Sequence, residues 1–255
     1  QTGNDFFPGP VSIGSTSISE DECLKYDKHW KINRTEVQDF VDNFGSGNTI
    51  PNSILTWPGN GNSEQTQFLA PFNDVNGDGV YDPAGSGDYP NYDLDGKASC
   101  KSCGNPDYKD LLFGDQTLWW VFNDVGNIHS ETGAEPIGLE IQAQAFGFTT
   151  NDEINNMTFY QYKIINRSTY QVNDTYFGQW VDSDLGNAYD DYVGCDVERG
   201  LGYCYNGDPF DETTSSQNGY GTHPPAIGVD FFQGPLADPG DGIDNNKNCT
   251  VDEPC

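Results

Sequence analysis

The chain has 255 residues, and its 11 Lys and Arg against 40 Asp and Glu give a formal net charge of −29. This charge argues against binding to nucleic acid or to an anionic membrane surface, and no apolar run is long enough for a membrane-spanning helix. Aromatic residues make up 13% of the chain, which argues against disorder. Aspartate outnumbers glutamate, and 30 Gly and 15 Pro accompany it. We therefore expect strands joined by structured loops rather than long helices.

The first part of the chain predicts one short helix. Residues 1–30 have few periodic apolar positions, and we expect them to be extended and to pair with a segment outside this chain. In NRTEVQDFVDNFG, apolar residues follow helical spacing after Asn33, a residue type that caps helices. We therefore predict a helix over residues 34–44, closed by Gly45.

Further along the chain the pattern becomes that of strands. The predicted strands are residues 117–124, 137–148, 156–168, 175–182 and 225–234. The sequence shows no regular alternation of strands and helices of the βαβ kind. We therefore predict an all-β fold, an antiparallel β-sandwich of the jelly-roll or immunoglobulin-like kind. We expect one domain over residues 1–235. Residues 236–255 should form an acidic calcium-type loop or linker to further domains.

Two of these strands indicate which side chains are buried. The second strand alternates between an apolar set and a polar set, namely Leu139, Ile141, Ala143 and Ala145 against Glu140, Gln142 and Gln144. Such alternation is typical of an antiparallel strand with one face in water. In the first strand, the adjacent Trp119 and Trp120 must face opposite ways, and we expect one of them in the core.

The clearest motif is the acidic segment FNDVNGDGVYDP. Its candidate calcium ligands are Asp74, Asn76, Asp78, Val80, Asp82 and Asp88. Positions 1, 3, 5 and 9 of an EF-hand-type loop are held by Asp74, Asn76, Asp78 and Asp82. Val80 supplies a carbonyl, and Gly79 permits the sharp turn at position 6. The usual Glu at position 12 is replaced by Gly85, so we expect Asp88 to close the shell. The alternative is a turn without metal.

A second acidic segment lies near the end of the chain, in DPGDGIDNNKNCTVDEPC. Its candidate ligands are Asp241, Asp244, Asn246, Asn248, Asp252 and Glu253. Part of this set repeats the spacing of the first loop, but Cys249 stands where the turn glycine should be. The geometry must therefore differ, and a flexible acidic linker is the alternative.

The third acidic segment reads WVDSDLGNAYDDYVGCD. Its candidate ligands are Asp182, Asp184, Asp190, Asp191 and Asp196. Oxygen ligands without a nearby histidine favour calcium over zinc or iron, and we expect two to three calcium ions in the whole chain. One alternative is a pair of catalytic carboxylates as in glycoside hydrolases, with Trp180 and Tyr192 as sugar platforms. Another is a solvated acidic loop.

Six of the seven cysteines occur as close pairs, which are Cys100 with Cys103, Cys195 with Cys204, and Cys249 with Cys255. A zinc site would need a second CxxC or clustered histidines, and neither is present in the sequence. We therefore predict three local disulfides and an oxidising compartment. Cys23 has no local partner.

An ordered set of motifs carries a family resemblance: NDFFPGP, TWPGNG, APFNDVNGDGVYDP, GDYP, FGDQTLWWVFND, GLEIQAQAFGF, FYQYKIINRS, FGQWVDSDLGNAYDDYVGCD, LGYCYNGD, PPAIGVDFFQGP and DGIDNN. With these motifs the chain resembles the large secreted surface proteins of Bacteroidota that end in a type IX secretion sorting domain. The resemblance runs from Asp5 to about Asp252 and implies export to, or release from, the cell surface. It implies little about activity. The chain shows neither signal peptide nor sorting domain, and we expect Gln1 to be an internal start.

These observations favour a structural or adhesive module, stabilised by calcium and disulfides, in a surface layer, filament or adhesin. Its expected partners are other copies of itself, other surface proteins or glycans, and its expected location is extracellular or at the cell surface. A carbohydrate-binding module is the alternative, and a glycoside hydrolase using the carboxylates of residues 182–196 is a weaker one. Motifs of serine hydrolases, zinc proteases and nucleotide-binding enzymes are absent from the sequence, which argues against an enzyme.

Overall fold

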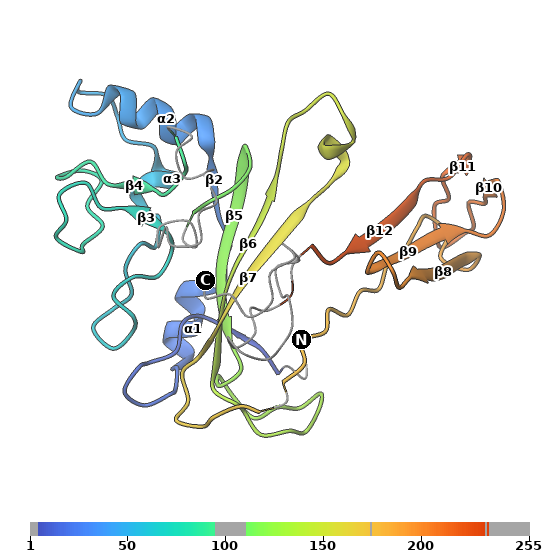
Figure 1. Ribbon diagram of the computed structural model, residues 1–255, viewed down its shortest axis with the longest axis horizontal. Coiled ribbons are helices and arrows are strands. Elements are labelled where there is room, and N and C mark those ends of the chain that lie inside the picture. Colours follow the sequence, from blue (N-terminus) through green and yellow to red (C-terminus); the bar gives the residue numbers. More distant parts are fainter. Residues whose placement is uncertain (1–4, 95–110, 174, 233, 235–255) are drawn as a thin grey trace. The chain divides into compact units, whose positions relative to one another are not determined.

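The computed structural model describes residues 5–94, 111–173, 175–232 and 234. The chain divides into two compact units, Gln1–Gln171 and Val172–Cys255 (Figure 1). The boundary between them falls inside the single domain that we predict over residues 1–235. In the described part, strands outnumber helices and the named strands pair antiparallel. The predicted strand-rich, antiparallel character is therefore confirmed.

A five-stranded antiparallel sheet forms the frame of unit 1. Its strands are β1 (Phe7–Pro8), β2 (Trp30–Asn33), β5 (Gln116–Asn123), β6 (Leu139–Gly147) and β7 (Phe159–Asn166). The order across the sheet is β1-β5-β6-β7, and β2 shares with β1 the edge of β5 that β6 leaves open. The predicted strands over 117–124, 137–148 and 156–168 are confirmed, because β5, β6 and β7 lie at these places.

The described residues form three α-helices, which are α1 (Glu20–Tyr26), α2 (Arg34–Asn43) and α3 (Asn52–Leu55), and one 3-10 helix, η2 (Glu153–Asn156). The predicted helix over residues 34–44 is confirmed as α2, which buries Val37 and Phe40. Gly45 follows with a φ of 80°, the left-handed conformation that ends helices. Asn33 holds the N-cap position, but its side chain caps nothing and accepts a hydrogen bond from Gln116 Nε2 (2.9 Å).

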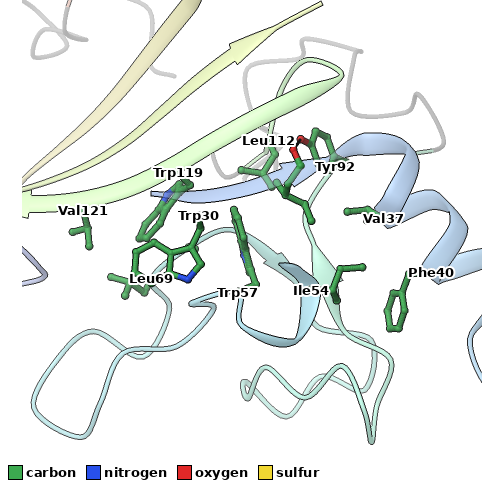
Figure 2. Packing of buried hydrophobic residues seen from close by; sticks show 12 residues of the cluster. Trp30, Val37, Phe40, Ile54, Trp57, Leu69, Tyr92, Leu112, Trp119 and Val121 are labelled. Atoms are coloured by element: carbon green, nitrogen blue, oxygen red, sulfur yellow. Dashed lines mark hydrogen bonds between the residues drawn. The ribbon is translucent and has the colours of Figure 1, made fainter. Parts of the chain in front are cut away.

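The hydrophobic core of unit 1 is built around three tryptophans. The ring centroid of Trp119 on β5 lies 5.8 Å from that of Trp30 on β2 and 6.2 Å from that of Trp57. Side chains of α2 and α3 complete the cluster on the same side of the sheet (Figure 2). Trp119 is only 2% exposed, whereas Trp120 on the opposite face is half-buried. The expectation that one of the pair lies in the core is therefore confirmed.

The polar side of β6 is buried, which contradicts the predicted wet face. Glu140, Gln142 and Gln144 are at most 6% exposed. Glu140 forms an ion pair with Arg167, and Gln144 Nε2 donates to Gln161 Oε1 (2.6 Å). Buried polar groups are stable when they bond to each other, and this network allows the side that carries Glu140 to face the protein interior.

The opposite face of the sheet is apolar and partly exposed. Its side chains on β6 and β7 are Ile141, Ala143, Ala145, Tyr160, Tyr162 and Ile164. Tyr160 and Tyr162 stack with their ring centroids 6.5 Å apart and are 54% and 44% exposed. We call this surface the outer sheet face.

Unit 2 contains a second, smaller antiparallel sheet. Its strands are β8 (Asp191–Asp196), β9 (Leu201–Asn206) and β12 (Ala226–Asp230), in the order β12-β9-β8. A short pair, β10 (Phe210–Asp211) with β11 (Gly221–Thr222), lies in the same unit (Figure 1). The predicted strand over 225–234 corresponds to β12. The strand predicted over 175–182 is wrong: these residues have no regular structure, and Tyr176 and Trp180 are 93% and 83% exposed.

Candidate functional site

The first acidic loop connects β3 (Phe72–Asn73) to β4 (Tyr89–Pro90), which pair with each other and close its base. Within the loop, the Asp74 carboxylate accepts the backbone N–H groups of Gly77 (2.8 Å), Asp78 (3.2 Å) and Gly79 (2.7 Å). Gly77 and Gly79 have φ angles of 75° and 77°, which glycine adopts without strain. The sharp turn predicted at Gly79 is therefore present.

Asp88 joins the two arms of this loop. Its side chain is fully buried, and its two oxygens accept the backbone N–H groups of Val75 (2.9 Å) and Asp82 (2.8 Å). The sequence predicts Asp88 as a calcium ligand that closes the shell, whereas in the structure both of its oxygens are bonded to the backbone of the loop. A Cβ atom at Gly85 would clash with Asp82 Oδ2, so a larger residue there would displace the Asp82 side chain.

The other predicted ligands of the loop also bond within it. Asn76 Nδ2 donates to Asp78 Oδ2 (2.9 Å), and Asp78 Oδ1 accepts the N–H of Val80 (2.8 Å). Asp82 Oδ1 accepts the N–H of Gly85 (2.8 Å). Over the described ranges, no three or more His, Cys, Asp or Glu side chains are gathered as a metal-binding group. The loop thus collects oxygen-bearing side chains in one turn and satisfies them with its own backbone N–H groups.

The second acidic segment lies outside the described residues. This applies to the predicted ligands Asp241, Asp244, Asn246, Asn248, Asp252 and Glu253, and to the cysteines Cys100, Cys103, Cys249 and Cys255. Calcium and disulfides at these positions stay predictions.

The third acidic segment is only partly a loop. Asp182 and Asp184 are exposed in the irregular stretch, whereas Asp191 and Asp196 begin and end β8. Asp196 forms an ion pair with Arg199 and accepts its backbone N–H (3.2 Å). The five predicted carboxylates are therefore not gathered at one point, since strand formation separates Asp196 from Asp191 by the length of β8.

The structure places Asp190 and Asp191 beside Asn206 and Gly207 of β9 and its following turn, which the sequence did not single out. Asp191 stands directly opposite Asn206 of β9, and the carbonyl of Asp190 accepts the N–H of Gly207 (2.8 Å). Asn187, in the loop before β8, donates its backbone N–H to Asp211 Oδ1 (3.1 Å). The adjacent N-A-Y-D-D spacing could have pointed to Asn187, but only the strand register identifies Asn206.

Cys195 and Cys204 are free thiols, so the predicted disulfide between them is not formed. In the register of β8 and β9, Cys195 stands opposite Gly202, and Cys204 stands opposite Val193. The two cysteines are diagonal neighbours, at about 7–8 Å, whereas the Cβ atoms of a disulfide span about 4.5 Å or less. Cys204 Sγ instead donates to the carbonyl of Ser183 (3.9 Å).

An exposed strip of tyrosines covers one face of the sheet in unit 2. The ring of Tyr205 stacks on Tyr192 with centroids 6.1 Å apart and lies 6.0 Å from the ring of Tyr203. Gly194 and Gly228 stand opposite Tyr203 on the two neighbouring strands. Because these glycines have no side chains, the Tyr203 ring has room to lie across the sheet. We call Tyr192, Tyr203 and Tyr205 the tyrosine strip.

Comparison of the chain with protein-family models, with curated proteins and with solved structures gives no match. The resemblance to secreted surface proteins therefore stays an expectation from sequence motifs. Among the helices that the structure describes, none combines the length and apolar character needed to cross a membrane. The features of the structure that bear on function are the acidic loops, the tyrosine strip and the outer sheet face.

Proposed function

We propose that this chain is an extracellular structural or adhesive module of a large secreted surface protein, with acidic loops stabilised by calcium. The observation that carries the proposal is the 74–88 loop, in which aspartates and one asparagine surround a single turn at the base formed by β3 and β4. Hard oxygen ligands of this kind suit calcium. A cation would also reduce the self-repulsion of a chain with a net charge of −29.

The contacts in this loop divide its residues into two roles. Asp88 is fully buried and bonded to backbone N–H groups at both arms, so it would hold the loop rather than the ion. Asp74, Asn76, Asp78 and Asp82 would hold the ion, together with the Val80 carbonyl. The two roles are separable by mutation.

The calcium part of the proposal is tested by chelation of the purified full chain. We expect removal of calcium to lower the melting temperature, and calcium, but not magnesium at the same concentration, to restore it. Asp78→Asn should reduce this shift, whereas Asp39→Asn, at an exposed position of α2, should leave it unchanged. An identical melting temperature with and without chelator would remove calcium from the proposal.

The outer sheet face supports the structural role. Its exposed side chains on β7, Tyr160, Tyr162 and Ile164, would be covered in a β-sandwich, since an apolar sheet face is buried against a second layer. We infer that the five-stranded sheet is one layer of such a sandwich, and that other copies of the chain or other surface proteins complete or extend it. Electron microscopy of the purified protein tests this role. Filaments or a lattice would support it, and a uniform monomer at all concentrations would oppose it.

The tyrosine strip favours carbohydrate binding as the second candidate function. Flat, exposed aromatic rings can stack on sugar rings, and Tyr192 and Tyr205 are 59% and 42% exposed. A pull-down with insoluble polysaccharides tests this function. Tyr205→Ala should lose binding, whereas Tyr176→Ala, at a residue 93% exposed outside the strip, should retain it. Equal retention of both variants on every polysaccharide would reject the strip as a binding site.

A further inference from the structure

Among the described residues of unit 2, four buried side-chain oxygens have no hydrogen-bond partner. They are Asn187 Oδ1, Asp190 Oδ1, Asp191 Oδ1 and Asn206 Oδ1, and we call them the oxygen cluster. In the part of the chain that the structure describes, one other side-chain atom shares this condition, Ser53 Oγ of unit 1. Asn187 and Asn206 are only 5% and 8% exposed. An unsatisfied buried polar atom is costly, and four in one unit call for an explanation.

Strand pairing and hydrogen bonds hold these four residues in one small region. Asp191 and Asn206 are directly opposite across β8 and β9, so their side chains lie on the same face of the sheet. The carbonyl of Asp190 is bonded to the N–H of Gly207, the residue next to Asn206. Asn206 Nδ2 donates to the carbonyl of Phe210 (3.4 Å). The residue after Phe210 is Asp211, whose carboxylate accepts the backbone N–H of Asn187.

Two of these four side chains, Asp191 and Asn206, are oriented by the surrounding backbone. Asp191 Oδ2 accepts the N–H of Leu185 (3.0 Å), which leaves only Oδ1 without a partner. Asn206 Nδ2 donates to the carbonyl of Asp208 (3.0 Å), which fixes the orientation of its amide. Asp211 is 1% exposed and accepts the backbone N–H groups of Asn187 (3.1 Å) and Tyr220 (2.7 Å). Hydrogen bonds therefore orient the side chains of Asp191 and Asn206 and anchor the backbone of Asn187.

The chemistry of the cluster identifies what it lacks. All four atoms are acceptors, and two of them belong to carboxylates. One buried water has two hydrogens to donate, so it would leave two acceptors unsatisfied and the negative charge uncompensated. A divalent cation, by contrast, accepts several oxygen ligands and neutralises two carboxylates at once. Carboxylate and amide oxygens, without nitrogen or sulfur, are the ligands of calcium.

We propose that Asn187, Asp190, Asp191 and Asn206 bind one calcium ion, which ties the loop before β8 to β9. This ligand set replaces the five aspartates that the sequence predicts in the segment 180–196, since Asp196 is paired with Arg199. The site is separate from the 74–88 loop, and it does not depend on whether the protein is structural, adhesive or sugar-binding.

The site is tested by calcium titration of the full chain after complete chelation, with calorimetry to count the ions. Asn187→Ala removes one ligand oxygen from a side chain that lies mostly out of solvent. We expect this variant to lose one bound ion, or to bind it about tenfold or more weakly. Asn187→Asp is the matched variant, because it keeps an oxygen and adds charge, and should bind calcium at least as tightly as the unmodified chain. Asn218→Ala, at an exposed asparagine of the same unit, is the control.

Three further measurements distinguish loss of the site from misfolding or from an effect on the other loop. Circular dichroism should show that both Asn187 variants fold. Asp78→Asn in the 74–88 loop should leave calcium binding at the oxygen cluster unchanged. Terbium in place of calcium should luminesce on excitation of tyrosine, and Asn187→Ala should lose that part of the signal. The proposal is overturned if Asn187→Ala binds as many ions as the unmodified chain with the same affinity, or if Asn187→Asp behaves like Asn187→Ala. Failure here leaves the chelation and imaging tests of the proposed function untouched.

Discussion

The Arg167 guanidinium holds the buried Glu140 carboxylate at two points, Nη2 to Oε1 at 2.9 Å and Nε to Oε2 at 3.2 Å. Glu140 also accepts the backbone N–H of Val11 (2.9 Å) and the side-chain amide of Gln142 (2.9 Å). One side chain on β6 therefore joins the start of the chain, its own strand and the residue after β7.

Glu140→Gln should strongly destabilise unit 1. The substitution removes one charge of a pair whose carboxylate side chain is fully buried, and breaking such a pair costs on the order of 3–5 kcal/mol. Urea unfolding, followed by tryptophan fluorescence, measures the change. Asp196→Asn is the matched control, because its partner Arg199 is mostly exposed and exposed pairs contribute about 1 kcal/mol or less. Equal effects of the two substitutions would refute the role given to Glu140.

Two adjacent residues of α3 offer a test of the core. Ile54 is fully buried, whereas Leu55 is 47% exposed. We expect Ile54→Ala to lower the free energy of unfolding by about 2–5 kcal/mol, because it leaves a cavity beside Trp57 and its neighbours. Leu55→Ala should cost far less, and chemical denaturation of the two variants compares them. A larger loss for Leu55→Ala would show that α3 packs with its other face inward.

Alkaline pH should weaken unit 1 through two buried tyrosines. Burial raises the pKa of Tyr26 and Tyr92 from 10.0 to about 12. Unfolding restores the ordinary pKa, so the unfolded chain loses these protons first. The stability that this difference provides is complete below pH 10 and is lost as the pH rises to about 12. Denaturation curves measured across this range should show the fall.

Tyr92→Phe separates this effect from general alkaline damage. Tyr92 is 3% exposed, and its hydroxyl bonds to Thr117 Oγ1 (2.6 Å). The variant should be less stable at neutral pH and should lose less stability between pH 10 and 12. An unchanged pH dependence would show that folding does not raise the pKa of Tyr92.

The three described cysteines should differ in thiol reactivity. Cys195 is exposed, Cys204 is 2% exposed, and burial raises the pKa of the Cys23 thiol. Because the thiolate is the reactive form, iodoacetamide should label Cys195 first, with Cys23 and Cys204 following slowly. Peptide mass spectrometry under non-reducing conditions measures the order. A peptide in which Cys195 is linked to Cys204 would contradict the free thiols.

Local sequence patterns predict a helix or a strand correctly where the pattern is regular or where several local signals indicate the same element. The helix at 34–44 combines apolar spacing with a closing glycine, and β6 shows strict alternation. Alternation alone does not tell which face is buried: the burial of Glu140 depends on Arg167, which is distant in sequence. The helix α1 escaped prediction although Ser19 caps it and Lys25 lies in its last turn, since it buries no residue that would create a period.

The candidate sites, too, are predictable where the signal is local in the sequence and not where it depends on strand pairing. The turn of the 74–88 loop follows from glycine spacing, so the sequence predicts it in detail. The aspartates between 182 and 196 look like one loop in the sequence, but β8 runs through them and separates them. The pairing of Asp191 with Asn206 is a product of strand register, which a run of acidic letters does not contain. Strand register, rather than composition, brings Asn206 to the oxygen cluster.

The hydrogen bonds of Asp74 in the first loop span three to five residues of sequence. Contacts of such short range close with little loss of chain entropy and form quickly. The pairing of β1 with β5, by contrast, must join Phe7 to Asn123 across most of unit 1. The 74–88 turn can therefore take shape early in folding, before the sheet assembles around it, and a nascent chain would carry an ordered acidic turn while its long-range strands are still unpaired.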